Sequence, residues 1–200
     1  WNVGTDYGTY ENCKKVLYIS AEMTPDRISA RMDAIAGKFN SRIIRSKKDL
    51  KQLKEAKQKA IKSWELVRLA GGDVIIPKLG VISPQMVLDL INTHKPDFVV
   101  CDAMYRFVIP GMGKDWRGDA EIVRSIANIA RITNTPILGT TQLSRASEKG
   151  NYDLGDISFT DASGQEASIV LAAWNMPSHP NSIIIKTLKA RDGVKHGQVE

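Results

Sequence analysis

Cysteine, histidine and long apolar runs are scarce in this chain. Its two cysteines, Cys13 and Cys101, are too far apart for a disulfide framework, and the three histidines have no metal-ligand spacing with them. No apolar run approaches the roughly 18 residues that a membrane-spanning helix needs. The composition therefore argues against a disulfide-stapled scaffold, a Cys/His metal centre and a membrane protein, and we expect a cytoplasmic location.

The sequence also lacks G-x-x-x-x-G-K-[ST], the loop with which many nucleotide-hydrolysing proteins cradle phosphate groups. The chain begins at Trp1 rather than at a methionine, and it ends at Glu200 inside what reads as a starting strand. We therefore expect a piece of a longer protein. An N-terminal motif would then be missing by truncation rather than by loss.

Positive charge is in excess, since 28 Lys+Arg against 22 Asp+Glu give a formal net charge of +6. Such a balance favours a polyanionic partner. Much of the excess lies within residues 42–62, however, where a lysine-rich helix can simply be solvated. On charge alone, nucleic acid and plain solvation explain the excess equally well.

Apolar runs that alternate with helical periods predict a single α/β domain with a parallel sheet. The expected parallel strands are 16–20, 74–76, 97–102 and 136–141. One expected helix begins after Thr24, and the other three cover 49–70, 85–92 and 119–133. Further strands at 169–174, at 182–188 and from 197 are joined by loops alone, which predicts that the sheet ends in antiparallel hairpins.

Apolar residues at helical spacing predict the buried face of each helix. After Thr24 they are Ile28, Met32 and Ile35. In the long helix they are Leu50, Leu53, Ala60, Ile61, Trp64 and Val67, with lysines over the remainder. In the last two helices they are Met86, Leu90 and Ile91, and then Ile122, Ile126, Ile129 and Ala130.

Three of the predicted parallel strands are followed by polar residues, namely Glu22, Asp102 and Gln142. Because the carboxyl ends of parallel strands share one edge, we expect these residues to converge on one site. Asp102 can hold Mg²⁺, usually through its water shell, beside phosphate groups. Glu22 can deprotonate an attacking water, and Gln142 can detect a γ-phosphate. Taken singly, Asp102 is better explained as a turn residue and Glu22 as a solvated loop residue.

Two further features are basic. Residues 143–158 include Arg145 and Lys149 among small and polar residues, as expected of a loop that touches a nucleic-acid backbone. Lys189 and Arg191 follow the strand at 182–188, and strand alternation puts them on one side, where such a pair can clamp phosphate. A plain surface loop and an exposed basic turn are the competing interpretations.

In their order along the chain, these segments resemble the RecA-like ATPase domain of DnaB-type replicative helicases, particularly the phage relatives. VLYISAEMTPDRISARM is similar to that family's strand, catalytic glutamate and helix, and KPDFVVCD is similar to its Walker B strand. AEIVRSIANIARITNTPILGTTQLSR is similar to the helix and strand that lead to the sensor glutamine. SGQEASIVLAAW and IIIKTLKARDG are similar to the following segment and to the Lys-x-Arg finger strand. The resemblance covers nearly the whole chain.

This resemblance implies a RecA-like P-loop NTPase core, a mostly parallel twisted sheet flanked by helices, with antiparallel C-terminal strands. Residues 1–200 would be one such domain without its phosphate loop, which would lie shortly upstream of Trp1, and without its last C-terminal strands. The cofactors would be ATP and Mg²⁺. Glu22 would be the catalytic base, Asp102 the Mg²⁺ ligand through water, and Gln142 the γ-phosphate sensor.

The resemblance further implies that Lys189 and Arg191 reach the nucleotide of a neighbouring subunit, with Arg191 as the arginine finger. That arrangement demands a homo-oligomeric ring, expected to be a hexamer in the full-length protein, that moves along single-stranded DNA. Ser158 and Phe159 stand where relatives usually carry DNA-facing charges, so DNA contact would come from backbone amides and from residues such as Arg145 or Lys149. Primase or a helicase loader would be a further partner, and no membrane is implied.

Two alternatives stay open. Another RecA-like motor, such as a recombinase or a plasmid-type hexameric helicase, would share the sheet and the Walker B strand. A degenerate RecA-like module would bind nucleic acid or a partner without hydrolysis, and the missing phosphate loop is its only support. In every case we expect the 200-residue fragment itself to be inactive, because the amides and lysine that cradle phosphates are not in it.

Overall fold

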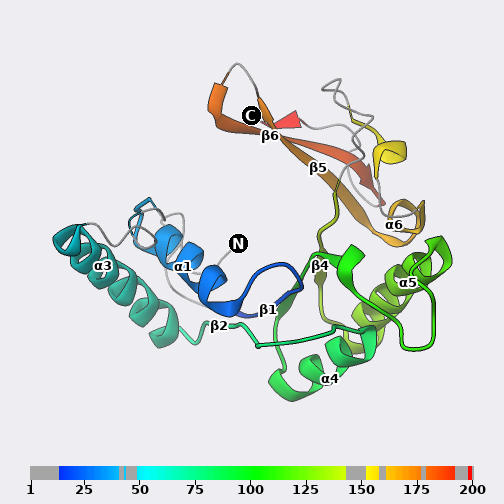
Figure 1. Cartoon of the computed structure of the whole chain (residues 1–200), viewed down its shortest axis with the longest axis horizontal. Coiled ribbons are helices and arrows are strands. Elements are labelled where there is room, and N and C mark those ends of the chain that lie inside the picture. The colour runs from blue at the N-terminus through cyan, green and yellow to red at the C-terminus, as the bar shows by residue number, and fades with distance from the viewer. Residues whose placement is uncertain are drawn as a thin grey trace.

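The structure is a computed structural model, and it describes residues 14–40, 43, 49–142, 152–157, 161–176, 179–191 and 198–199. Its centre is a four-stranded parallel sheet in the order β2–β1–β3–β4 (Figure 1). The strands are β1 (Lys15–Ser20), β2 (Asp73–Ile75), β3 (Phe98–Asp102) and β4 (Ile137–Gly139). The predicted parallel α/β core is therefore confirmed.

The two central strands are buried on both faces. Val16 and Leu17 are adjacent in β1 and point to opposite faces, yet both are buried, and the same holds for Val99 and Val100 in β3. Strands of this kind appear in a sequence as short continuous apolar runs, which is why both were predictable. The register pairs Ser20 with Asp102, so β1 and β3 end at the same edge of the sheet.

Helices α1 (Pro25–Ala36), α3 (Leu50–Leu69), α4 (Pro84–His94) and α5 (Trp116–Thr133) connect the strands. α4 begins at the predicted Ser83-Pro84 signature, with the serine hydroxyl as its cap. α5 begins at Trp116 rather than near Asp119, which corrects the sequence prediction. The reason is that Asp115 caps the helix earlier, by accepting hydrogen bonds from the backbone N–H groups two and three residues further on.

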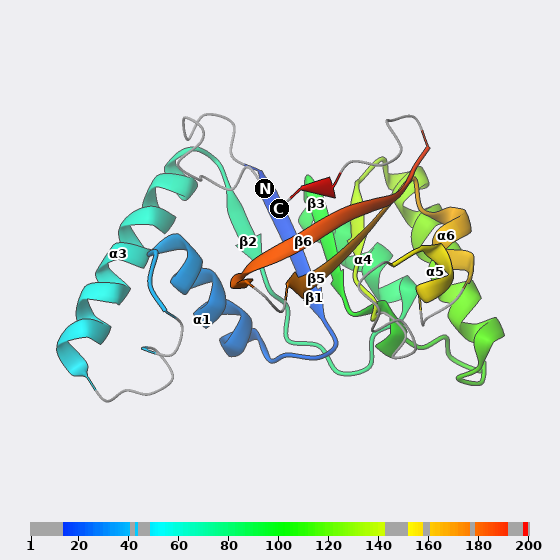
Figure 2. The same cartoon turned by 90° about the horizontal axis from the view of Figure 1, so that it is seen from above.

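α3 packs against α1 rather than against the sheet, and both views show it as the outermost helix on that side (Figures 1 and 2). Its buried residues are Ala56, Ala60 and Val67, whose small side chains let the two helices approach closely. The buried faces predicted from the sequence were wrong at one position in α1 and at two positions in α3. In α1, Ile35 is 74% exposed. In α3, Leu50 is 73% exposed and Ile61 is 55% exposed, because a single helix covers a narrower face than a sheet does.

The C-terminal part forms a separate antiparallel sheet in the order β5–β6–β7, rather than a continuation of the parallel sheet. Its strands are β5 (Ile169–Met176), β6 (His179–Ala190) and β7 (Gln198–Val199), and the short helix α6 (Asp161–Glu166) precedes them. The predicted antiparallel pairing is confirmed, but in the described part of the chain these strands form a sheet of their own and do not end the parallel sheet. Among the described residues, β4 pairs only with β3, and β5 pairs only with β6.

A hydrophobic core holds the parallel sheet to α4 and α5. Leu17 of β1 and Val99 of β3 pack there with Val87 of α4 and Ile126 of α5. Phe107, which is 1% exposed, extends this core beyond the 3₁₀ turn η1 (Met104–Arg106) that follows β3. The carboxyl ends of β1 and β3 are therefore anchored on closely packed neighbours. No helix in the described part of the chain is long and apolar enough to cross a membrane.

Candidate active site

The structure brings Glu22, Asp102 and Gln142 to one edge of the parallel sheet, as expected from strand order. The backbone N–H of Ala21 donates to the carbonyl of Asp102 at 2.6 Å, which ties the end of β1 to the end of β3. The backbone N–H of Thr140 donates to the carbonyl of Cys101 at 3.0 Å and ties in the residues after β4. Glu22, Asp102 and Gln142 therefore lie at or just past the carboxyl ends of three adjacent strands, β1, β3 and β4.

Asp102 is half-buried, and hydroxyl groups hold both of its carboxylate oxygens. Thr140 Oγ1 donates to Oδ1 at 2.8 Å, and the Tyr18 hydroxyl donates to Oδ2 at 3.0 Å. Burial, together with the charge of Asp102 and this hydrogen bond, raises the pKa of Tyr18 to about 12, so the phenol keeps its proton and remains a donor at neutral pH. The two donors fix the orientation of the carboxylate, as outer-sphere partners do for metal-binding carboxylates.

Glu22 lies beside two residues of the turn that follows β3. The Tyr105 hydroxyl donates to Glu22 Oε1, and Arg106 Nε donates to the same oxygen at 3.3 Å. The Tyr105 hydrogen bond, and after it Arg106, hold the pKa of Glu22 below its ordinary value. Glu22 is therefore ionised at neutral pH, as a proton acceptor must be.

Gln142 belongs to the same network, because its side-chain Nε2 donates to the Tyr105 hydroxyl at 3.0 Å. The phenol oxygen thus accepts from Gln142 while its proton is donated to Glu22. Sequence reasoning missed Tyr105 and Arg106, because both lie in the connection between the strand predicted at 97–102 and the helix predicted at 119–133. The signal that was available was their position, three and four residues after Asp102 and directly past the end of a buried strand.

The structure places Lys189 and Arg191 at α6. Lys189 Nζ donates to the carbonyls of Gly164 and Gln165 at 2.6 and 2.9 Å, and Arg191 Nη2 donates to the carbonyl of Gln165 at 3.0 Å. The two cations lie on one side of the chain, as strand alternation predicted. Their hydrogen bonds satisfy the carbonyls that end α6 and do not join the network around Glu22. Arg145 and Lys149 lie outside the described residues.

Asp102 could by itself provide the protein ligand for Mg²⁺, because this ion needs few ligands from the protein. This ion keeps several waters and usually binds through one or two carboxylates and the phosphates of a substrate. Within the described part of the chain, no group of three or more His, Cys, Asp or Glu could hold a metal ion by itself. The oriented carboxylate of Asp102 fits a phosphate-bound Mg²⁺ and not a dedicated protein cage.

Comparison with known proteins gives matches in structure alone. No protein-family model matches the sequence, and no curated protein matches it. The structure matches a DnaB-like replicative helicase, studied with its interactions with primase, at a TM-score of 0.77 with 19% identity. It also matches the RadB recombinase at a TM-score of 0.52 with 14% identity.

The match with the helicase covers 92% of this chain and 47% of the helicase, so this chain spans about half the length of that protein. The match with RadB covers 92% of this chain and 73% of the recombinase. The chain therefore has a RecA-like fold, in which helices flank a parallel sheet.

Proposed function

We propose that this chain is most of the ATPase domain of a ring-forming, DnaB-like replicative helicase that couples ATP hydrolysis to movement along single-stranded DNA. One observation carries the proposal, namely the hydrogen-bonded network that joins Glu22, Tyr105 and Gln142 beside the oriented carboxylate of Asp102. It places an ionised acceptor, a metal-ligand candidate and a neutral amide at one sheet edge. Phosphoryl transfer to water needs these three groups.

Each group has a distinct part in the proposed reaction. Glu22 accepts a proton from the attacking water through its carboxylate, and the lowered pKa of Glu22 favours the ionised form of that group. Asp102, held by Thr140 and Tyr18, would hold Mg²⁺ through water, and that ion would neutralise phosphate charge. The Gln142 amide would bind the γ-phosphate, which would weaken its hydrogen bond to Tyr105 and so report the phosphate to Glu22.

The lateral sides of β4 and β5 are consistent with the proposal that a phosphate loop lies upstream in the same polypeptide. β4 and β5 each have one edge without a strand partner among the described residues, and Leu138, Ile169 and Leu171 are exposed beside those edges. Thr141 Oγ1, just past β4, is buried without a hydrogen-bond partner in the described structure. A strand inserted between β4 and β5 would join the sheets, and a loop at its carboxyl end would reach the edge that carries Asp102.

The remaining assignments belong to the assembled protein. Lys189 and Arg191 would turn from α6 to a neighbouring subunit's nucleotide in a hexameric ring. Arg145 and Lys149 would contact the DNA backbone, and primase or a loader would bind the ring. Such a phage-type helicase would work in the cytoplasm of a bacterial cell.

The test is to express the complete open reading frame that encodes this chain and to measure ATP hydrolysis with and without single-stranded DNA. We expect DNA-stimulated hydrolysis, and we expect Glu22→Gln to abolish turnover while nucleotide binding is retained. Glu65→Gln, on exposed α3, is the matched control and should hydrolyse ATP like the wild type. Undiminished hydrolysis in Glu22→Gln would remove Glu22 from the role of base.

The RadB match keeps a recombinase as the second candidate. Unwinding of a forked duplex without strand exchange would favour the helicase, and the reverse result would favour the recombinase. A complete reading frame without a phosphate loop, whose product does not hydrolyse ATP, would leave only a degenerate binding module. The 200-residue chain itself should bind ATP poorly, so micromolar binding would contradict the proposed position of the loop.

A further inference from the structure

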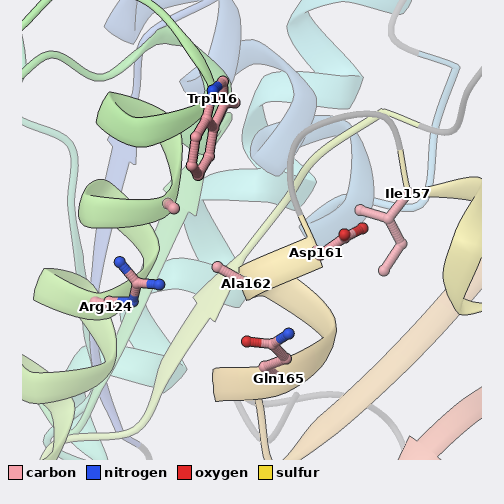
Figure 3. Close-up of a pocket in the computed structure, with 7 residues that line it drawn as sticks. Trp116, Arg124, Ile157, Asp161, Ala162 and Gln165 are labelled. Atoms are coloured by element: carbon pink, nitrogen blue, oxygen red, sulfur yellow. The ribbon is translucent and has the colours of Figure 1, made fainter.

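A groove of about 500 Å³ lies between α5 and α6 (Figure 3). Side chains from both helices line it: Trp116, Ala120 and Arg124 from α5, and Asp161, Ala162 and Gln165 from α6. Two of these lining residues are alanines, whose side chains are short. Its volume is within the range of small-ligand sites, roughly 300–1,000 Å³.

Trp116 is the most unusual residue of this groove, because 69% of it is exposed. An exposed aromatic ring beside a groove offers a flat apolar face on which a planar ligand can stack. The Arg117 guanidinium lies 5.3 Å from the centre of the Trp116 ring and keeps positive charge beside it. Trp116 and Arg124 are eight residues apart on α5, and Figure 3 shows both on the side of the helix that faces α6.

We propose that this groove binds one nucleotide of a single-stranded nucleic acid. The base stacks on Trp116, and Arg124 and Arg117 contact the phosphates on either side of it. Stacking on an aromatic ring beside cations is how sequence-tolerant single-strand sites work. The Asp161 carboxylate repels phosphate but accepts hydrogen bonds from the amino groups of bases, so the base faces α6 and the backbone stays near the arginines.

Gln165 connects this groove to the basic pair at the end of β6. Its side chain lines the groove, while its backbone carbonyl accepts hydrogen bonds from Lys189 and Arg191. A nucleotide that displaces α6 therefore changes the hydrogen bonds that hold both cations. The inference rests on the proposed function in choosing nucleic acid over a peptide, and it supplies a physical route by which DNA would stimulate hydrolysis.

The test measures fluorescence anisotropy of labelled oligo(dT) with the product of the complete reading frame. We expect Trp116→Ala to weaken binding about tenfold or more, and Trp116→Phe, which keeps a stacking ring, to stay within about threefold of the wild type. Arg124→Ala should weaken binding and lower the salt dependence by about one released counterion. The matched control is Arg27→Ala, because Arg27 is an exposed arginine on α1. This variant should change neither the affinity for oligo(dT) nor its salt dependence.

Equal binding by Trp116→Ala and the wild type would overturn the inference. So would equal losses in Trp116→Ala and Trp116→Phe, or a Trp116→Ala defect confined to protein assembly, which would indicate that the groove takes a protein segment. ATP hydrolysis by the wild type, measured without DNA, distinguishes failure of the groove assignment from failure of the proposed function. If the wild type hydrolyses ATP and binds oligo(dT) regardless of Trp116, only the groove assignment falls; if it does neither, both fall.

Discussion

Tyr105 links two residues that the sequence separates by 120 positions, since its hydroxyl donates to Glu22 and accepts from Gln142. A phenol in this position cannot change one hydrogen bond without affecting the other, because one oxygen takes part in both. At the scale of single residues, Tyr105 is therefore the positioning residue of the proposed site. Tyr105 fixes the positions of Glu22 and Gln142 relative to each other without having to contact the substrate.

Tyr105→Phe keeps the ring and removes both hydrogen bonds. The pKa of Glu22 should rise toward its ordinary value, because the Tyr105 hydrogen bond is the largest cause that lowers it. An NMR titration of the Glu22 carboxyl carbon in both proteins measures this change. In the complete protein kcat should fall more than KM rises. An unchanged titration midpoint would show that Tyr105 does not control the charge of Glu22.

The lowered pKa of Glu22 also predicts how stability depends on pH. A carboxyl whose folded-state pKa is depressed adds stability above its unfolded pKa, and this is lost as pH falls through the folded value. Urea unfolding of the wild type and Glu22→Gln should therefore differ more at about pH 7 than at about pH 3. The difference should be small, because solvent screens this exposed carboxylate. A gap that widens on acidification would have the wrong sign.

At the scale of elements, the start of α5 depends on one glycine. A Cβ on Gly118 would lie 2.5 Å from the backbone carbonyl oxygen of Gly113, whereas a Cβ on Gly113 would meet nothing within 4 Å. The clash is with backbone, so it cannot be relieved by rotating a side chain. The first turn of α5 therefore approaches the preceding loop as closely as it does because residue 118 has no side chain.

Gly118→Ala should destabilise the protein by about 1–3 kcal/mol, although alanine is the better helix former. Gly113→Ala, the matched control, should be close to neutral. Asp115→Ala should cost about 1 kcal/mol through loss of the helix cap. Thermal or urea unfolding of the three variants measures these differences. Equal stability of Gly118→Ala and Gly113→Ala would show that the loop containing Gly113 moves aside to make room for the added methyl group.

The elements also show how far sequence reasoning could reach. Buried strands such as β1 and β3 and the Ser83-Pro84 helix start depend on local patterns, and these were predicted correctly. The exposure of Leu50 and Ile61 depends on which element α3 packs against, and no local pattern records that choice. The link through Tyr105 likewise depends on the path of a turn. Strand order predicted that the polar residues would meet, but not what would join them.

At the scale of the whole molecule, the two proposed halves of the catalytic machinery lie on different sheets. Asp102 and Glu22 are at the edge of the parallel sheet, whereas Lys189 and Arg191 are on the antiparallel sheet and hold α6. In the protomer these cations already have hydrogen-bond acceptors. Action on a neighbour's nucleotide would require them to exchange carbonyl oxygens for phosphate oxygens, which are the stronger partners.

Arg191→Ala in the complete protein should assemble normally and hydrolyse ATP poorly. Mixing it with a phosphate-loop variant should restore part of the activity, because some interfaces then combine an intact loop with an intact arginine. Hydrolysis measured across a series of mixing ratios, with assembly checked by light scattering, tests this. If no ratio restores activity although mixed rings form, Arg191 does not act between subunits.

Within the described part of the chain, β4 and β5 each have one side without a paired strand, and this has a consequence for solutions of the 200-residue chain. Each presents a row of backbone donors and acceptors beside exposed apolar side chains, and such a row is a template for strands from other molecules. Copies of the chain can satisfy these edges by adding to one another, so self-association should rise steeply with concentration. The sides of β4 and β5 at which an additional strand is proposed would therefore also promote self-association of the 200-residue chain.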